Sequence, residues 1–198
     1  MKKLMLFLTL TVLIAGCAPK TVYVDPDNDT GKVVLSLDYR DFDIAIREMT
    51  QSLLTEGKIR KPGGGKYVVT TGQVVNDTTQ RIDTRQLLAS IEEELLRSNV
   101  VDFTSSIGTT GDSMINEARK LRDSDEFDQG TVQAMGQLIG PDLSVSGKIF
   151  ERVVHYDNHK KQVEYYIELI VTDLRTGLRF WQKQVRILKR GGKKVPIW

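Results

Sequence analysis

Residues 143–188 read LSVSGKIFERVVHYDNHKKQVEYYIELIVTDLRTGLRFWQKQVRIL, and this stretch decides the fold. Branched and aromatic residues alternate with polar ones in three runs, at 143–156, 162–173 and 178–188. A period of two predicts three strands. Turn-forming residues separate the runs, Asn158-His159 and then Arg175-Thr176-Gly177, in which Gly177 suits a positive φ. The stretch therefore predicts an antiparallel meander.

The chain before this meander mixes helical and strand patterns. Helices are predicted for residues 39–56, for residues from Asp83 or Thr84 to about Leu96, and for 112–121 and 131–139. Strands are predicted for residues 67–75 and 100–104, with 32–37 as a candidate short edge strand. This order predicts an α/β (α+β) fold in which helices flank one mixed β-sheet.

The N-terminus predicts a lipid anchor. Two lysines precede an apolar run at residues 4–14, and two small residues follow it, as in a secretory signal. The run is too short to span a bilayer as a mature helix. The sequence Leu-Ile-Ala-Gly-Cys17 resembles a bacterial lipobox, in which the cysteine is acylated and becomes the N-terminus. The alternative is an ordinary secreted protein with a spare cysteine. Ala18 follows where sorting commonly reads Asp as an inner-membrane signal, so outer-membrane anchoring is favoured.

Composition indicates one domain after the signal. The predicted organisation is a signal peptide at 1–16, an anchor and linker at 17–31, a globular domain at 32–190 and a basic tail at 191–198. Residues 1–16 contain two lysines and no acid, so the mature chain has equal numbers of basic and acidic residues. A balanced charge implies no nucleic-acid partner. The apolar share of 40% is enough to fill one core.

Three stretches of the chain belong together: VVTTGQVVNDTTQRIDT at 68–84, Leu95-Leu96-Arg97-Ser98 in the following helix, and TDLRTGLRFW at 172–181. In this order and spacing they resemble the LpoB family, lipoprotein activators of penicillin-binding proteins. The resemblance covers about residues 36–190. It implies a three-layer sandwich similar to the N-terminal domain of the translocation protein TolB. It also implies a non-enzymatic monomer without a cofactor, which docks on a class A penicillin-binding protein from the outer membrane and stimulates peptidoglycan synthesis.

The linker departs from the pattern of this family. Well-described members carry a long disordered linker, whereas residues 17–31 number only 15. Fully stretched, they span at most about 50 Å at 3.3 to 3.6 Å per residue. That reach is short for an outer-membrane anchor whose partner lies at the inner membrane. Three alternatives follow: the synthase domain extends further, the envelope is thinner, or this chain serves another partner.

Five residues within these motifs are candidates for partner binding: Asn76, Thr78, Arg81, Asp83 and Trp181. Asn76, Thr78 and Asp83 stand at a turn or a helix start, where their side chains can instead satisfy the backbone. Arg81 is a candidate charge for a docking surface, with a solvated arginine as the alternative. Trp181 alternates with Lys183 and Val185 on one strand face, which favours core packing over a partner hot spot.

Other apparent motifs indicate no active site. Gly63-Gly64-Gly65-Lys66 lacks the preceding strand and following helix of a phosphate loop, and it is interpreted as a hinge. His155 and His159 flank a turn and fall short of a metal ligand set. No serine or cysteine nucleophile has a base beside it, and a hydrolase with paired carboxylates is the weakest hypothesis.

The C-terminal part from Trp181 to Trp198 contains six basic residues and no acidic one. One interpretation is a solvated edge strand guarded by lysine against aggregation. The other is a basic surface for an acidic partner, a teichoic or lipid phosphate, or wall carboxylates. For the whole chain, the alternative to a synthase activator is an outer-membrane assembly or secretion lipoprotein of related fold.

Overall fold

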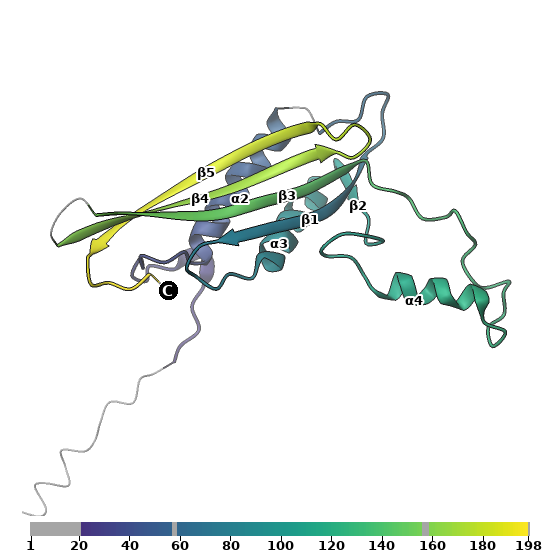
Figure 1. Cartoon of the computed structure of the whole chain (residues 1–198), viewed down its shortest axis with the longest axis horizontal. Helices are drawn as coiled ribbons and strands as arrows, with labels where there is room; N and C mark the ends of the chain where they lie inside the picture. Colours follow the sequence, from purple (N-terminus) through teal and green to yellow (C-terminus); the bar gives the residue numbers. More distant parts are fainter. Residues whose placement is uncertain (1–20, 57–58, 156–158, 198) are drawn as a thin grey trace, which may run out of the picture. The chain divides into compact units, whose positions relative to one another are not determined.

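The computed structural model describes residues 21–56, 59–155 and 159–197 (Figure 1). Cys17 and the rest of the predicted signal and lipobox lie outside the described residues, as do Asn158 and Trp198. The chain divides into two units between Lys32 and Val33. The elements are η2 (Pro26–Asn28), α2 (Tyr39–Thr55), β1 (Tyr67–Asp77), α3 (Thr84–Arg97), β2 (Val101–Phe103), α4 (Met114–Lys120), η3 (Leu121–Asp123), β3 (Leu143–His155), β4 (Lys160–Asp173) and β5 (Arg179–Gly192).

The five strands form one mixed sheet in the order β2-β1-β3-β4-β5. β1 runs parallel to β2 and β3, whereas β3, β4 and β5 are antiparallel neighbours. The register pairs Val145 with Val171 and Val171 with Trp181, so the buried side chains of the three strands share one face. The predicted fold class, with a mixed sheet and a C-terminal antiparallel meander, is confirmed.

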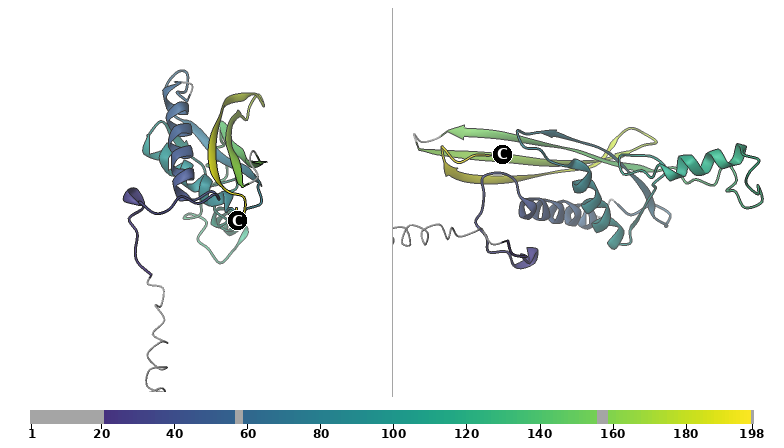
Figure 2. Two further views of the ribbon diagram at one scale, coloured as in Figure 1. Left: turned by 90° about the vertical axis from the view of Figure 1, so that its left-hand side faces the viewer. Right: turned by 90° about the horizontal axis from the view of Figure 1, so that it is seen from below.

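Helices α2 and α3 cover the same face of the sheet (Figure 2). In α2, Ala45, Met49 and Leu53 are buried at helical spacing, and α3 contributes Leu88 and Ile91 among others. Each fully buried Leu, Ile or Met side chain stabilises the fold by about 1.5–3 kcal/mol. The resemblance implied three layers; in the described residues these two helices together form one layer against the sheet.

Two glycines allow conformations that other residues would disturb. Gly177 has a φ of +72° in the β4–β5 turn, as its sequence context predicted, and its N–H donates to Asp173 O at 2.8 Å. In β3, a Cβ at Gly147 would lie 2.2 Å from Glu168 O of β4. A side chain at position 147 would therefore push β3 and β4 apart.

Two sequence predictions are wrong. Residues 131–139 form no helix: Gly136 interrupts them with a φ of +78°, and none of their side chains is buried. A short apolar pattern without a surface to pack on does not hold a helix. Residues 32–37 form no edge strand, because side chains rather than a neighbouring strand bind the backbone of Leu35 and Leu37.

The remaining differences are at element ends. The predicted helix at 112–121 is the shorter α4, and it continues as η3. Strand β5 extends to Gly192, so it includes the first residues of the predicted basic tail.

Candidate functional site

A groove lies between the start of α2, the start of α3 and the connection that precedes α3. Its cavity volume is about 320 Å³. The apolar lining is Leu37, Tyr39, Phe42, Ile46, Ile82 and Leu87, and the polar lining is Asp38, Asp43, Gln80, Arg81, Asp83, Gln86 and Ser90. We call this the α2–α3 groove. Apolar walls with a polar rim are typical of surfaces that bind another protein.

The turn that leads into the groove is closed by its own side chains. Asn76 donates from Nδ2 to Gln80 O at 2.8 Å, and its Oδ1 accepts from Thr78 Oγ1 at 2.8 Å and Thr78 N at 3.2 Å. Asp83 caps α3, because its Oδ1 accepts from Arg85 N at 3.0 Å. Asn76, Thr78 and Asp83 therefore satisfy the backbone as the turn interpretation predicts, and Asp83 also lines the groove.

Arg81 occupies a different position from these turn residues. It is exposed, and among the described residues no hydrogen bond or ion pair of its side chain is found. It lines both the α2–α3 groove and a second hollow beside it, to which Gln73 and Thr109 contribute. The guanidinium is thus available to an external acceptor, and Arg is a residue type enriched at binding hot spots.

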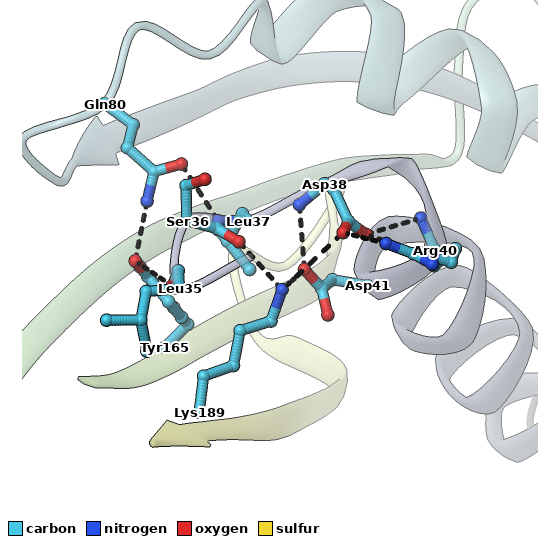
Figure 3. A network of polar contacts seen from close by, with 9 residues as sticks. All are labelled: Leu35, Ser36, Leu37, Asp38, Arg40, Asp41, Gln80, Tyr165 and Lys189. Carbon is cyan, nitrogen blue, oxygen red and sulfur yellow. Dashed lines mark hydrogen bonds and ion pairs between the residues drawn. The ribbon is translucent and has the colours of Figure 1, made fainter. Parts of the chain in front are cut away.

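A polar network joins residues 35–37 to Gln80, to Tyr165 of β4 and to Lys189 of β5 (Figure 3). Gln80 Oε1 accepts from Leu37 N at 3.0 Å, and Gln80 Nε2 donates to Tyr165 Oη at 2.8 Å. The Tyr165 hydroxyl donates in turn to Leu35 O at 3.0 Å. Burial raises the pKa of Tyr165, so the hydroxyl stays protonated and remains a donor. These bonds fix the segment before α2 to the 76–83 turn and to β4.

Lys189 of β5 completes the network. Its Nζ donates to Ser36 O at 2.7 Å, and it pairs with Asp41 and, at 3.9 Å, with Asp38. Asp38 is the N-cap of α2, and its backbone N–H donates to Asp41 Oδ2 at 2.8 Å, which forms a capping box. We call the contacts of Gln80, Tyr165 and Lys189 with residues 35–37 the clasp.

The two carboxylates of this network are shifted in opposite directions. Burial raises the pKa of Asp41, and the hydrogen bond from Lys189 only partly offsets that effect. Burial also acts on Asp38, but the hydrogen bond from Arg40 and the charges of Lys189 and Arg40 outweigh it and lower the pKa. The difference follows from position, since Asp38 is the more exposed of the two.

Trp181, the fifth candidate for partner binding, is buried. It is 5% exposed and lines the same small internal cavity as Met49, Ile91 and Val145. The structure thus corrects the assignment of Trp181 to a partner-binding surface, because its ring is covered by α2 and α3. The core position is the one that strand alternation favoured.

Sequence reasoning missed the clasp. Lys189 was counted with the exposed basic residues of the C-terminal part, but it is 7% exposed. The signal that it is buried is its spacing of four from Val185, on the same strand face as Trp181. Gln80 gives no such signal, because its partners are 43 and 85 residues away.

In the part of the chain that the structure describes, no group of three or more His, Cys, Asp or Glu side chains is arranged to hold a metal ion. Gly63, Gly64 and Gly65 all have positive φ, as a loop of glycines allows. Within residues 21–56, 59–155 and 159–197, no helix has the length and apolar character needed to cross a membrane.

The chain is a mixed α+β domain with a groove between two of its helices, and a family comparison assigns it to a class. The model of the family described as peptidoglycan-synthase activator LpoB matches residues 41–187. The match extends from the first turn of α2 into β5 and covers well over half of the chain. The chain belongs to the LpoB family, which is a family of regulatory activators.

Several solved structures are similar to this chain. The LpoB C-terminal domain from Salmonella enterica is 8% identical, with a TM-score of 0.43, over 74% of this chain and 98% of that chain. The corresponding domain from Escherichia coli is 10% identical, with the same TM-score and coverage. Lipoprotein GNA1162 from Neisseria meningitidis is 12% identical, with a TM-score of 0.33, over 64% and 84%. A comparison with curated protein sequences found no match.

Proposed function

We propose that this protein is an activator that binds a class A penicillin-binding protein through the α2–α3 groove and stimulates glycan-chain synthesis and crosslinking. The observation that carries the proposal is the family match over residues 41–187, which include α3 and all but the first two residues of α2. Arg81 is the proposed charged contact, and Asp83 fixes the start of α3 beside it. The protein acts as a monomer and needs no cofactor of its own.

The mechanism proposed is a shift of the synthase between two conformations. A ligand that binds both conformations equally changes nothing, so the groove must bind the active form more tightly. Apolar side chains of the synthase would enter between Phe42 and Ile82, and an acidic group would pair with Arg81. The clasp contributes by holding the start of α2 at a fixed distance from the 76–83 turn.

The proposal places the protein at the outer membrane, facing the periplasm. Acylation of Cys17 would provide the anchor, residues 17–31 the linker and residues 32–190 the binding domain. The short linker means that the synthase must extend towards the outer membrane, or that the envelope is thin. Cys17→Ser tests the anchor, because only the thiol can be acylated; a variant that still incorporates a palmitate analogue contradicts it.

Arg81→Glu tests the binding site. In a glycan-polymerisation assay with a purified class A synthase, the wild-type protein should raise the rate and have no activity alone. The variant should bind the synthase about tenfold more weakly, since it replaces an attractive charge by a repulsive one. Arg60→Glu is the matched control, because Arg60 is also exposed and lies outside the groove.

Equal loss of stimulation in both variants would reject the groove as the site.

Light scattering distinguishes the proposed activator from the second candidate function. A stable ring-shaped oligomer with no effect on any class A synthase would favour an assembly or secretion lipoprotein instead.

A further inference from the structure

The first residues of the larger unit, which begins at Val33, lie beside the end of β5. Residues 33–36 and 188–191, together with Val195 and Pro196, line a hollow with a cavity volume of about 490 Å³. Leu35 packs directly on the backbone of Gly191, where a Cβ would lie 2.8 Å from Leu35 Cδ1. We call this the entry hollow. It lies at the end of β5, next to the residues that connect to the N-terminal linker.

Aliphatic side chains surround the entry hollow and remain exposed. Val33 is 74% exposed, Val34 45%, Leu188 51% and Val195 42%. Leu188 points away from the core, because Lys189, its neighbour in β5, points into it. Four large aliphatic side chains around one hollow form a cluster, and clusters of this kind indicate an interaction surface.

Basic residues border the same surface. Arg190 lines the hollow, and Lys193 and Lys194 follow it in an exposed segment. Lys160 is opposite Gly192 in the β4–β5 ladder, which adds another exposed cation at this end of the sheet. Among the residues that the structure describes, no acidic one lines the hollow, and the sequence has none from Trp181 onwards. The surface therefore combines positive charge with exposed aliphatic groups.

We propose that the entry hollow is a contact surface for a membrane that contains anionic phospholipid. Aliphatic side chains would insert at the level of the headgroups, and the lysines would lie against the phosphates, as in other peripheral membrane surfaces. A site for a soluble phosphate or a polyanion would need the cations alone and would gain nothing from exposed valines and leucine. The exposed aliphatic side chains around the entry hollow are therefore the observation that favours a lipid surface over a soluble anion.

The contact goes beyond synthase activation, although its location near a membrane rests on the proposed acylation of Cys17. A linker of 15 residues keeps the domain within about 50 Å of the anchor. At such a short range even a weak contact is populated, because the tether raises the effective concentration of the surface at the membrane. The contact would orient the domain on the leaflet that holds its own anchor.

The experiment measures vesicle binding without the lipid anchor. The mature chain, residues 17–198 with Cys17→Ser, is sedimented with vesicles containing phosphatidylglycerol and with vesicles of phosphatidylcholine alone. All described buried hydrophobic residues lie between Leu35 and Val185, so the removal of residues 1–16 leaves the core unchanged. Binding is expected to the anionic vesicles, and it should decrease as salt increases.

Two sets of variants separate charge from insertion. Lys193→Gln with Lys194→Gln should reduce the partition coefficient about 25-fold, on the basis of about fivefold per lysine near an anionic surface. Val33→Ser with Val195→Ser should reduce it several-fold without a change in charge. The matched control is Arg119→Gln with Lys120→Gln on α4, which should bind as the unsubstituted chain does.

Each other outcome overturns the proposal. Equal binding to both vesicle types, or an equal loss with the α4 variant, would show that the surface is not specific. Full binding by the serine variant, together with competition by inorganic phosphate, would assign the lysines to a soluble anion or polyanion. Stimulation of the synthase in detergent solution is measured separately on the same variants, so a failure here is distinguishable from a failure of the proposed function.

Discussion

The β3–β5 meander and residues 112–141 contain similar apolar residues but use them in opposite ways. In the meander, alternate side chains such as Val145, Val171 and Trp181 are buried against α2 and α3. Between residues 112 and 141 none is buried, and Met135 is 78% exposed. The comparison teaches that an apolar pattern becomes structure only where another element offers a surface to bury it.

The largest effect is expected from removing a side chain that the meander buries. Trp181→Ala should lower the free energy of unfolding by about 3–5 kcal/mol, because it leaves a cavity between the sheet and the helices. Urea denaturation followed by far-UV circular dichroism measures the change. A loss below about 1 kcal/mol would mean that Trp181 is not in the core.

The clasp provides the next test, because it buries the charge of Lys189 on the inner face of β5. Lys189→Ala should cost about 3 kcal/mol, because it leaves Asp41 without its cation and Ser36 O without a donor. Lys193→Ala, four residues further along and exposed, should change stability by less than about 0.5 kcal/mol. If the two lysine variants unfold at the same urea concentration, Lys189 is solvated.

The next prediction concerns the pH dependence of stability at the edge of the meander, where Asp142 precedes β3. Partial burial acts to raise the pKa of Asp142, but hydrogen bonds from Lys61 Nζ at 2.7 Å and Val68 N at 2.9 Å outweigh it and lower the pKa. The unfolded chain therefore binds this proton more tightly than the folded chain does. Asp142 stabilises the fold above about pH 4, its ordinary pKa, and this stability is lost as the pH falls below that value.

Asp142→Asn should remove that part of the pH dependence, with a loss of about 0.5 kcal/mol at neutral pH, because the pair with Lys61 is partly exposed. Asp41, whose pKa is raised, contributes in the opposite direction and must be kept in both proteins. Thermal unfolding from pH 7 to pH 3 measures the difference. Parallel curves for the two proteins would contradict the assignment.

The smallest effect is expected on the exposed side. Met135→Ser and Phe127→Ser should each change the free energy of unfolding by less than about 0.5 kcal/mol, because neither side chain is buried. Amide hydrogen exchange should be rapid through residues 124–140 and slow in β3–β5. A cost of more than about 1 kcal/mol for either serine would show that these residues pack on the folded core.

The strands and α3 could be predicted because their signals are local. Alternation over Leu143–Asp173 and the Asp83 cap need no knowledge of distant residues. The prediction of a helix at 131–139 was wrong because its apolar side chains have no other element to pack against. The clasp could not be predicted, since Tyr165 and Lys189 reach backbone atoms 130 and 153 residues away. Of the residues that line the groove, the sequence proposed Arg81 and Asp83 as candidates but none of the facing α2 residues, and the role of all of them stays a prediction.

The clasp also has a mechanical consequence. If the N-terminus is tethered and the domain is bound to a partner, tension along the chain reaches the fold first at Val33 and then at Leu35. There the load passes to side chains of β4, β5 and the 76–83 turn through Tyr165, Lys189 and Gln80. Force is thus shared by three attachment points in the sheet and a turn before it can unwind α2. The polar contacts of the clasp therefore also carry the tension that the linker transmits, so that α2 is not the first element to bear it.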